Sequence, residues 1–169
     1  MRVFEEKQWF NQWWVLLINF SVVGLLFYFL YEWYVSDNSV DKIASDNYLG
    51  QIAVIFMLLL IVGFMFVLRL KTAIDEVGIH FQFIPFHRGR KSILWNDMAE
   101  CHTRKYQPIL EYGGWGIKPI PKSKDMAYNV KGNMGIQIQL KNGKKLLIGT
   151  QKPEEAQTII NKYFKNERI

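Results

Sequence analysis

The sequence is short of the residues and motifs on which common catalytic sites are built. Its one cysteine, Cys101, has no partner for a disulfide within the chain, which fits a reducing compartment. No Gly-rich phosphate loop, nucleophile elbow or paired-carboxylate motif is present. Cys101 and His102 are adjacent, so on a strand they point to opposite faces and form neither a Cys–His pair nor part of a zinc site. We therefore expect no enzyme, metal or cofactor.

Charge is missing from two long stretches of the chain. Residues 13–31 and 48–68 contain no Asp, Glu, Lys or Arg over 19 and 21 positions. As helices they would be roughly 28 and 31 Å long, close to the hydrocarbon thickness of about 30 Å. We expect transmembrane helices at residues 12–34 and 48–70, joined by an acidic external loop at 35–47. Acidic and basic residues are absent at mid-depth, which argues against a pore or transporter.

Aromatic side chains flank these two stretches, as is typical of the membrane–water interface. The expected interface anchors are Trp9, Trp13, Trp14, Trp33, Tyr34 and Tyr48. The small or weakly polar side chains within the stretches are expected to line the contact between the helices: Asn19, Ser21, Gly24 and Gly63. Lys and Arg gather before the first stretch and after the second, so the positive-inside tendency places the flank at 1–11 and the carboxy-terminal part in the cytoplasm.

Residues 72–169 have the alternating pattern of antiparallel strands. The two clearest strands contain Ile79, Phe81 and Phe83, and Ile136, Ile138 and Leu140; weaker candidates lie at residues 94–96, 99–106, 115–118 and 127–130. A helix is expected from Pro153, because apolar residues then follow at helical spacing: Ala156, Ile159, Ile160, Tyr163 and Phe164.

Asn142-Gly143 between two apolar runs predicts a β-hairpin. A two-residue turn would place Ile138 opposite Leu147. A three-residue loop would place Ile138 opposite Leu146 and Gly143 at the left-handed position of a bulged turn. We favour the second register because it pairs more aliphatic side chains.

Several fragments of this region resemble those of bacterial pleckstrin-homology-like (PH domain) membrane proteins of unknown function, which also carry a preceding helix pair. The fragments are IDEVGI at 74–79, EYGGWGI at 111–117, AYNV at 127–130 and LIGTQKP at 147–153. The resemblance implies an α+β protein with a two-helix transmembrane hairpin and a small PH-like antiparallel β-barrel closed by a C-terminal α-helix. It also implies a location in the bacterial cytoplasmic (inner) membrane. It carries over no ligand.

The carboxy-terminal region is basic, with 16 Lys and Arg against 9 Asp and Glu from Thr72 onward. Such a surface beside an anionic leaflet favours lipid or partner contact, while solubility and positive-inside bias account for it as well. The candidate contact residues are Arg88, Arg90, Lys91, Lys118, Lys122, Lys124, Lys144 and Lys145. The glycines of Gly113-Gly114-Trp115-Gly116 predict a tight bend that turns Trp115 into the core, rather than a ligand platform.

We expect an integral membrane protein that presents a cytoplasmic binding or scaffold module to membrane lipid, to a protein partner or to its own copies as a homo-oligomer. The alternative is an accessory subunit of a membrane transport or stress-response complex, held through its helices. A nucleic-acid partner is not expected, because the aromatic stacking motif of RNA-binding sheets is missing.

Overall fold

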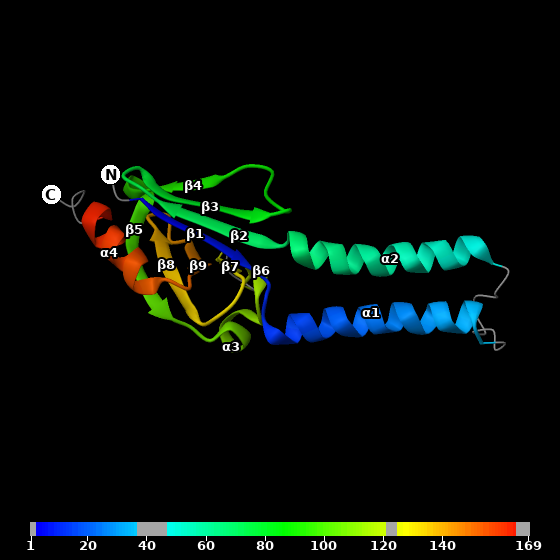
Figure 1. Cartoon of the computed structure of the whole chain (residues 1–169). Helices are drawn as coiled ribbons and strands as arrows, with labels where there is room; N and C mark the ends of the chain where they lie inside the picture. The colour runs from blue at the N-terminus through cyan, green and yellow to red at the C-terminus, as the bar shows by residue number, and fades with distance from the viewer. Residues whose placement is uncertain (1–2, 37–46, 121–124, 165–169) are drawn as a thin grey trace. The chain divides into compact units, whose positions relative to one another are not determined.

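A computed structural model of the chain describes residues 3–36, 47–120 and 125–164 (Figure 1). The chain forms two compact units. One contains Met1–Trp9 together with Leu68–Ile169, and the other contains Phe10–Val67. The expected loop at 35–47 lies mostly outside the described residues, as do Lys122 and Lys124.

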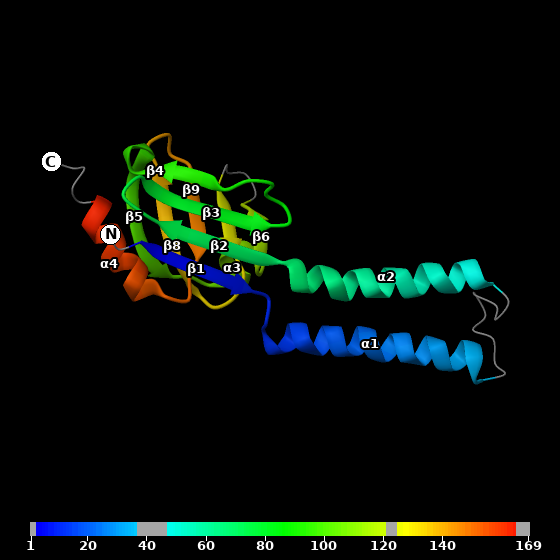
Figure 2. The same cartoon turned by 45° about the horizontal axis from the view of Figure 1, so that its top comes forward.

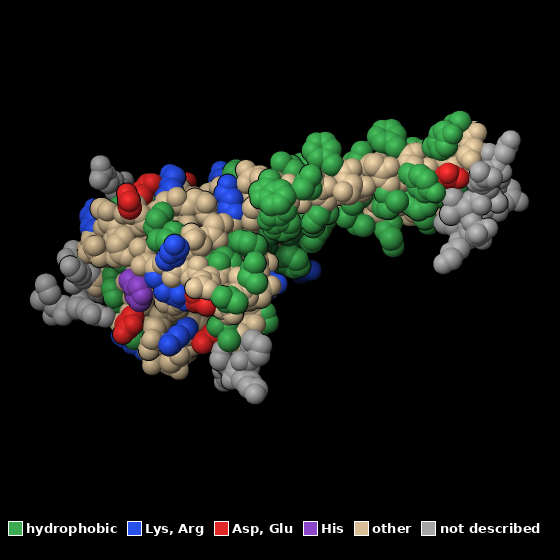
Figure 3. Space-filling model, turned by 90° about the horizontal axis from the view of Figure 1, so that it is seen from below, with side chains coloured by type: hydrophobic (Ala, Val, Ile, Leu, Met, Phe, Trp, Pro, Cys, Tyr) green, Lys and Arg blue, Asp and Glu red, His purple; other side chains and the backbone are tan. Residues whose placement is uncertain are grey.

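The second unit consists of two helices, α1 (Trp13–Tyr34) and α2 (Tyr48–Val67). Both are long and apolar enough to cross a membrane, which agrees with the predicted stretches. Apolar side chains run along them on the face seen in Figure 3. Most of the large ones are exposed, Trp13, Phe20, Leu49 and Phe56 among them. The core helix of a water-soluble protein buries such side chains, whereas here most of them stay exposed.

The helices meet through larger side chains than we expected. Tyr34 Oη donates a hydrogen bond of 3.1 Å to Gln51 Oε1, which joins the end of α1 to the start of α2. Within α1, the buried Trp33 ring stacks on Phe29 with centroids 5.4 Å apart. A Cβ atom built at Gly24 or Gly63 would meet no described atom within 4 Å. Those glycines therefore line no close contact between the helices, and the expectation for them is wrong.

The other unit begins with a four-stranded antiparallel sheet whose order follows the chain (Figure 2). Its strands are β1 (Phe4–Trp9), β2 (Arg69–Ile74), β3 (Gly78–Ile84) and β4 (Lys91–Leu94). In β1, and in β3 from Ile79 onward, every second side chain is buried, as the alternation around Phe81 predicts. The strand expected at 94–96 is wrong, because β4 ends at Leu94 and a 3₁₀ turn, η1 (Trp95–Asp97), follows.

The second sheet has five strands in the order β5-β8-β9-β7-β6. Its elements are β5 (Met98–Lys105), the short helix α3 (Pro108–Tyr112), β6 (Gly116–Pro119), β7 (Met126–Asn129), β8 (Met134–Leu140) and β9 (Lys145–Gly149). β7 and β9 pair in parallel, and the other pairs are antiparallel. No strand pairing joins the two sheets among the described strands, so the α+β class is confirmed but the barrel is not closed.

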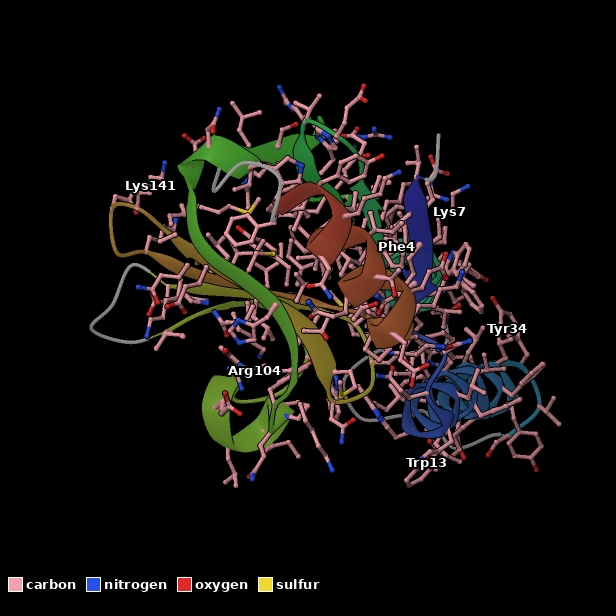
Figure 4. The ribbon with its side chains drawn as sticks, turned by 90° about the vertical axis from the view of Figure 1, so that its left-hand side faces the viewer. Phe4, Lys7, Trp13, Tyr34, Arg104 and Lys141 are labelled. Atoms are coloured by element: carbon pink, nitrogen blue, oxygen red, sulfur yellow. The ribbon has the colours of Figure 1, made fainter. Side chains whose placement is uncertain are left out.

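Two local predictions are confirmed. The β8–β9 hairpin has the three-residue loop, with Ile138 opposite Leu146 and with Gly143 at φ 83°. The final helix, α4 (Pro153–Phe164), buries Ala156, Ile159 and Ile160 and packs chiefly on β5 (Figure 4).

The first sheet takes in two segments that the sequence analysis assigned elsewhere. β1 comes from the flank at 1–11, and β2 begins at Arg69, inside the helix expected at 48–70. β1 was missed because two of its three inward side chains are polar. Glu6 accepts hydrogen bonds from Thr150 Oγ1 (2.7 Å) and the Gln151 backbone N–H (2.8 Å), and Gln8 Nε2 donates to the Gly149 carbonyl (2.7 Å).

Replacing Glu6 should therefore loosen the β domain. Glu6→Leu leaves the Thr150 hydroxyl and the Gln151 N–H without their acceptor, and we expect a loss of about 2 kcal/mol of unfolding free energy. Unfolding can be followed in detergent micelles through the reaction of Cys101, which is buried, with a thiol-specific dye. Glu76→Gln, at an exposed position of the turn between β2 and β3, should stay within about 0.5 kcal/mol of the parent. Equal stability of the two variants would contradict this role for Glu6.

Candidate functional site

The basic loop between β3 and β4 lies at the end of the first sheet where both apolar helices join it. Trp9, the last residue of β1, is opposite Arg69, the first of β2, and Arg69 is opposite Ile84 at the end of β3. Arg69 follows Val67, the end of α2, by two residues, which an extended chain covers in at most about 7 Å. The loop at 85–90 begins in this same row of residues.

The loop is held in shape by hydrogen bonds around His87. The His87 N–H donates to the Phe83 carbonyl (2.8 Å), and Gln82 Nε2 donates to the His87 carbonyl (3.1 Å). The Phe83 N–H donates to His87 Nδ1 (3.1 Å), so Nδ1 carries no proton. The ring also packs edge-on against Phe81 and Tyr128, with centroids 5.8 and 5.4 Å away.

The surroundings of His87 favour its neutral form. Burial lowers the pKa of His87 below its ordinary value of 6.5, and the nearby positive charge of Lys91 lowers it further. The Lys91 ammonium lies 5.9 Å from the centroid of the Tyr128 ring. His87 thus acts as a neutral brace between β3, the loop and β7.

Around this brace, the loop presents an apolar ring and two cations to solvent. Phe86 is 58% exposed, and Arg88 and Arg90 are exposed as well. An exposed aromatic ring between arginines suits a membrane–water interface, where the ring enters the headgroup level and the cations meet phosphates. The two arginines were predicted from the sequence as contact residues, whereas no role was predicted for Phe86.

The other predicted basic residues are not brought together with this loop. Lys118 is half-buried on β6, and Lys144 and Lys145 lie at the β8–β9 hairpin, where the Lys145 N–H donates to Asp125 Oδ1 (2.7 Å). Figure 4 shows Lys141, at the tip of that hairpin, on the opposite side of the domain from Lys7 of β1. Of the eight predicted residues, the six that the structure describes therefore lie on separate elements: Arg88, Arg90 and Lys91 at the β3–β4 loop, Lys118 on β6, and Lys144 and Lys145 at the β8–β9 hairpin.

The predicted interface anchors lie in different surroundings. Trp13, Tyr34 and Tyr48 are exposed at helix ends, whereas Trp14 is half-buried. Trp33 is 5% exposed and packs within the helix pair, while Trp9 belongs to β1 and is 44% exposed. Trp9 is therefore an aromatic side chain at the end of a strand that leads into a helix, rather than part of the helix.

The glycines after α3 form the predicted bend, with positive φ at Gly113, Gly114 and Gly116. The Gly116 N–H donates to Asn129 Oδ1 (2.8 Å), which fixes the start of β6. Trp115 is half-buried and donates from Nε1 to the Gly132 carbonyl (3.0 Å), so it does not enter the core as expected.

A polar hollow on the second sheet is braced internally. Arg104 donates from Nε to Gln137 (3.0 Å) and from Nη2 to Glu111 (2.7 Å) and to the Tyr112 hydroxyl (3.0 Å). The hydrogen bond from Arg104 lowers the pKa of Glu111. These bonds hold α3 against the sheet, and they occupy the one arginine that lines this hollow.

The described residues offer little for covalent or metal chemistry. Burial raises the pKa of Cys101 to about 12, so its thiol stays protonated, and no group of three potential ligands is placed to hold a metal within the described ranges. Ser92, His80 and Asp75 form a hydrogen-bonded chain with steps of 2.7 and 3.0 Å. The Asp75 carboxylate also accepts from the backbone of the β2–β3 turn, so the chain braces that turn.

Comparisons with known proteins add no relative. No protein-family model matches the chain, and a search of curated proteins finds no match. Support for a function therefore comes from the residues and their geometry.

The pH dependence of stability should report the state of His87. The unfolded chain binds a proton at His87 near pH 6.5, whereas the folded chain resists it, so stability is full above that pH and falls as the pH drops below it. We expect His87→Gln to lose part of the fall in Tm between pH 7.5 and 5.5. His102→Gln, which removes a histidine exposed on β5, should leave that part unchanged. An identical pH slope in His87→Gln and the parent would contradict the brace.

Proposed function

We propose that this chain is a non-enzymatic integral membrane protein of the bacterial cytoplasmic membrane. Its two helices cross the bilayer, and its β domain is a PH-like binding or scaffold module at the inner leaflet, in contact with anionic lipid or a protein partner. The observation that carries the proposal is the pairing of β1 with β2. It connects the domain to both apolar helices within a few residues.

The composition of the two units supports this division. Exposed apolar side chains cover helices that contain no Asp, Glu, Lys, Arg or His between residues 13 and 31 or between 48 and 67. All Lys and Arg residues of the sequence except Lys42 belong to the unit that contains the β domain. Anionic lipids of a cytoplasmic leaflet attract such basic segments by about 1 kcal/mol for each cation near the surface. One antiparallel sheet, one mixed sheet that is antiparallel except for the β7–β9 pair, and a carboxy-terminal helix support the PH-like assignment.

Cell fractionation tests the location. The full chain should stay in the membrane pellet after alkaline carbonate washing and be released by detergent, because two spanning helices anchor it. Protease added to intact spheroplasts should leave the β domain uncut, since both chain ends are proposed to face the cytoplasm. Recovery in the supernatant would overturn the membrane assignment, and digestion from outside would overturn the orientation.

Charge reversal tests the contact of the β3–β4 loop with lipid. In nanodiscs that contain anionic lipid, amide exchange at 85–90 should be slower than in nanodiscs of neutral lipid. Reversing Arg88, Arg90 and Lys91 to Glu should abolish that difference, because the attraction becomes repulsion. The matched triple Lys141→Glu, Lys144→Glu and Lys145→Glu, at the hairpin tip, should keep it. Loss of the difference in the hairpin triple alone would move the contact to the hairpin.

An accessory subunit of a transport or stress-response complex is the second candidate. The observation in its favour is the large exposed apolar surface of α1 and α2, which other transmembrane helices could cover as well as lipid. Crosslinking in native membranes distinguishes the two, because this role requires one stable membrane partner joined through residues 13–34 or 48–67.

A further inference from the structure

The outer face of the first sheet carries two lysines that face each other directly. Lys7 of β1 is opposite Lys71 of β2, with Gln82 of β3 next in the same row. Side chains at such positions have Cβ atoms about 5 Å apart, and like charges there destabilise a sheet. On the inward face of the same strands the charged group is satisfied, because each carboxylate oxygen of Glu6 accepts a hydrogen bond.

Cations outnumber carboxylates around this lysine pair among the residues that the structure describes. Neither lysine is in an ion pair, and nor is Arg90, which lines the same hollow. Glu5 lines the hollow too, so three cations stand against one carboxylate on this side of the sheet. The Glu6 carboxylate lies on the inward face of β1, where it accepts hydrogen bonds from Thr150 and Gln151.

The hollow has a shape that suits a small anion. It measures about 250 Å³ and its lining includes Ala73, whose short side chain lies in the row between Glu5 and His80. The His80 side chain, which also lines the hollow, is fixed by hydrogen bonds with Ser92 and Asp75. Lys7, Lys71 and Arg90 contribute flexible cationic groups around it, and Gln82 an amide.

The chain connection keeps this hollow close to the end of α2. Lys71 is four residues after Val67, so its backbone lies within roughly 14 Å of the end of α2 however the two units are arranged. The headgroup layer outside the hydrocarbon is roughly 5–7 Å thick on each side. Arg69, in the row nearer the helix, adds a further cation beside the exposed ring of Trp9.

Resting on the membrane location proposed above, we infer that Lys7, Lys71 and Arg90 bind the phosphate of an anionic phospholipid headgroup in this hollow. The bound phosphate offsets the repulsion between the two lysines. It also joins β1 to β2 through a lipid, so the edge strand of the domain is stabilised by the membrane that its helices enter.

The test compares the full chain in nanodiscs of phosphatidylcholine with the full chain in nanodiscs of equal parts phosphatidylcholine and phosphatidylglycerol. Unfolding of the β domain is followed through Cys101, the single cysteine of the sequence, so that the tryptophans of the helices do not contribute. The parent should melt several degrees higher in the anionic discs. Lys7→Gln and Lys71→Gln should each lose at least half of that shift.

The sign of the change in neutral discs separates binding from a general loss of stability. With no anion present, removing one of two facing cations should leave Tm unchanged or raise it, whereas a merely structural lysine would lower it. Lys141→Gln, on the far side of the domain, should behave as the parent in both discs. Full retention of the anionic shift in both hollow variants would overturn the inference, and so would a lower Tm in neutral discs.

A soluble ligand distinguishes the source of the phosphate. Glycerol 1-phosphate added to the neutral discs should reproduce little of the shift, because only the bilayer holds its phosphates beside the hollow. A shift as large as that in anionic discs would overturn the lipid assignment. Failure of the proposed function would appear as loss of the chain from the membrane pellet. Failure of the inferred phosphate site would leave the chain membrane-bound, with the Tm shift in anionic discs unchanged in the two lysine variants.

Discussion

The pairing of β1 with β2 is the constraint on which the rest of the structure depends. These strands are separated by the whole helical unit, yet six residue pairs join them from Phe4–Ile74 to Trp9–Arg69. A helix pair inserted between two hydrogen-bonded neighbours has both of its ends fixed at one end of one sheet. The chain passes between the sheet and the helices twice, through residues 10–12 and through Leu68.

The pairing of β1 with β2 explains which side chains the inner face of β1 requires. Phe4 is fully buried, while Glu6 and Gln8 reach the turn between β9 and α4 through hydrogen bonds of 2.7–2.8 Å. Buried polar groups are costly unless they are paired, so these bonds specify one position for the strand. They also tie the first strand of the domain to the segment that starts its last helix, 144 and 145 positions later in the chain.

Predictions from the sequence succeeded where the signal was local and apolar. The Asn142-Gly143 turn and the aliphatic runs beside it determine the register of the β8–β9 hairpin. The apolar stripe of α4 determines which face of that helix is buried. β1 could not be found in this way, because two of its three inward side chains, Glu6 and Gln8, are polar and their hydrogen-bond partners are distant in sequence. The start of β2 was missed because Arg69 and Leu70 directly follow the apolar run at 48–68, so the expected helix was extended through them.

For the charged residues of the candidate site, too, the sequence reveals only groups that are close together along the chain. Arg88, Arg90 and Lys91 lie within four consecutive positions, so the amino-acid sequence alone reveals them as a cluster. Lys7 and Lys71 are 64 positions apart, and only the strand register places them opposite each other. Each lysine alone is ordinary positive-inside bias, whereas the facing pair is an energetic cost. Among the described residues Glu5 lies on the same face of the sheet, yet neither lysine is in an ion pair. The phosphate that we infer in the hollow offsets this cost, and in the proposed membrane location the nearest phosphates are those of the lipid.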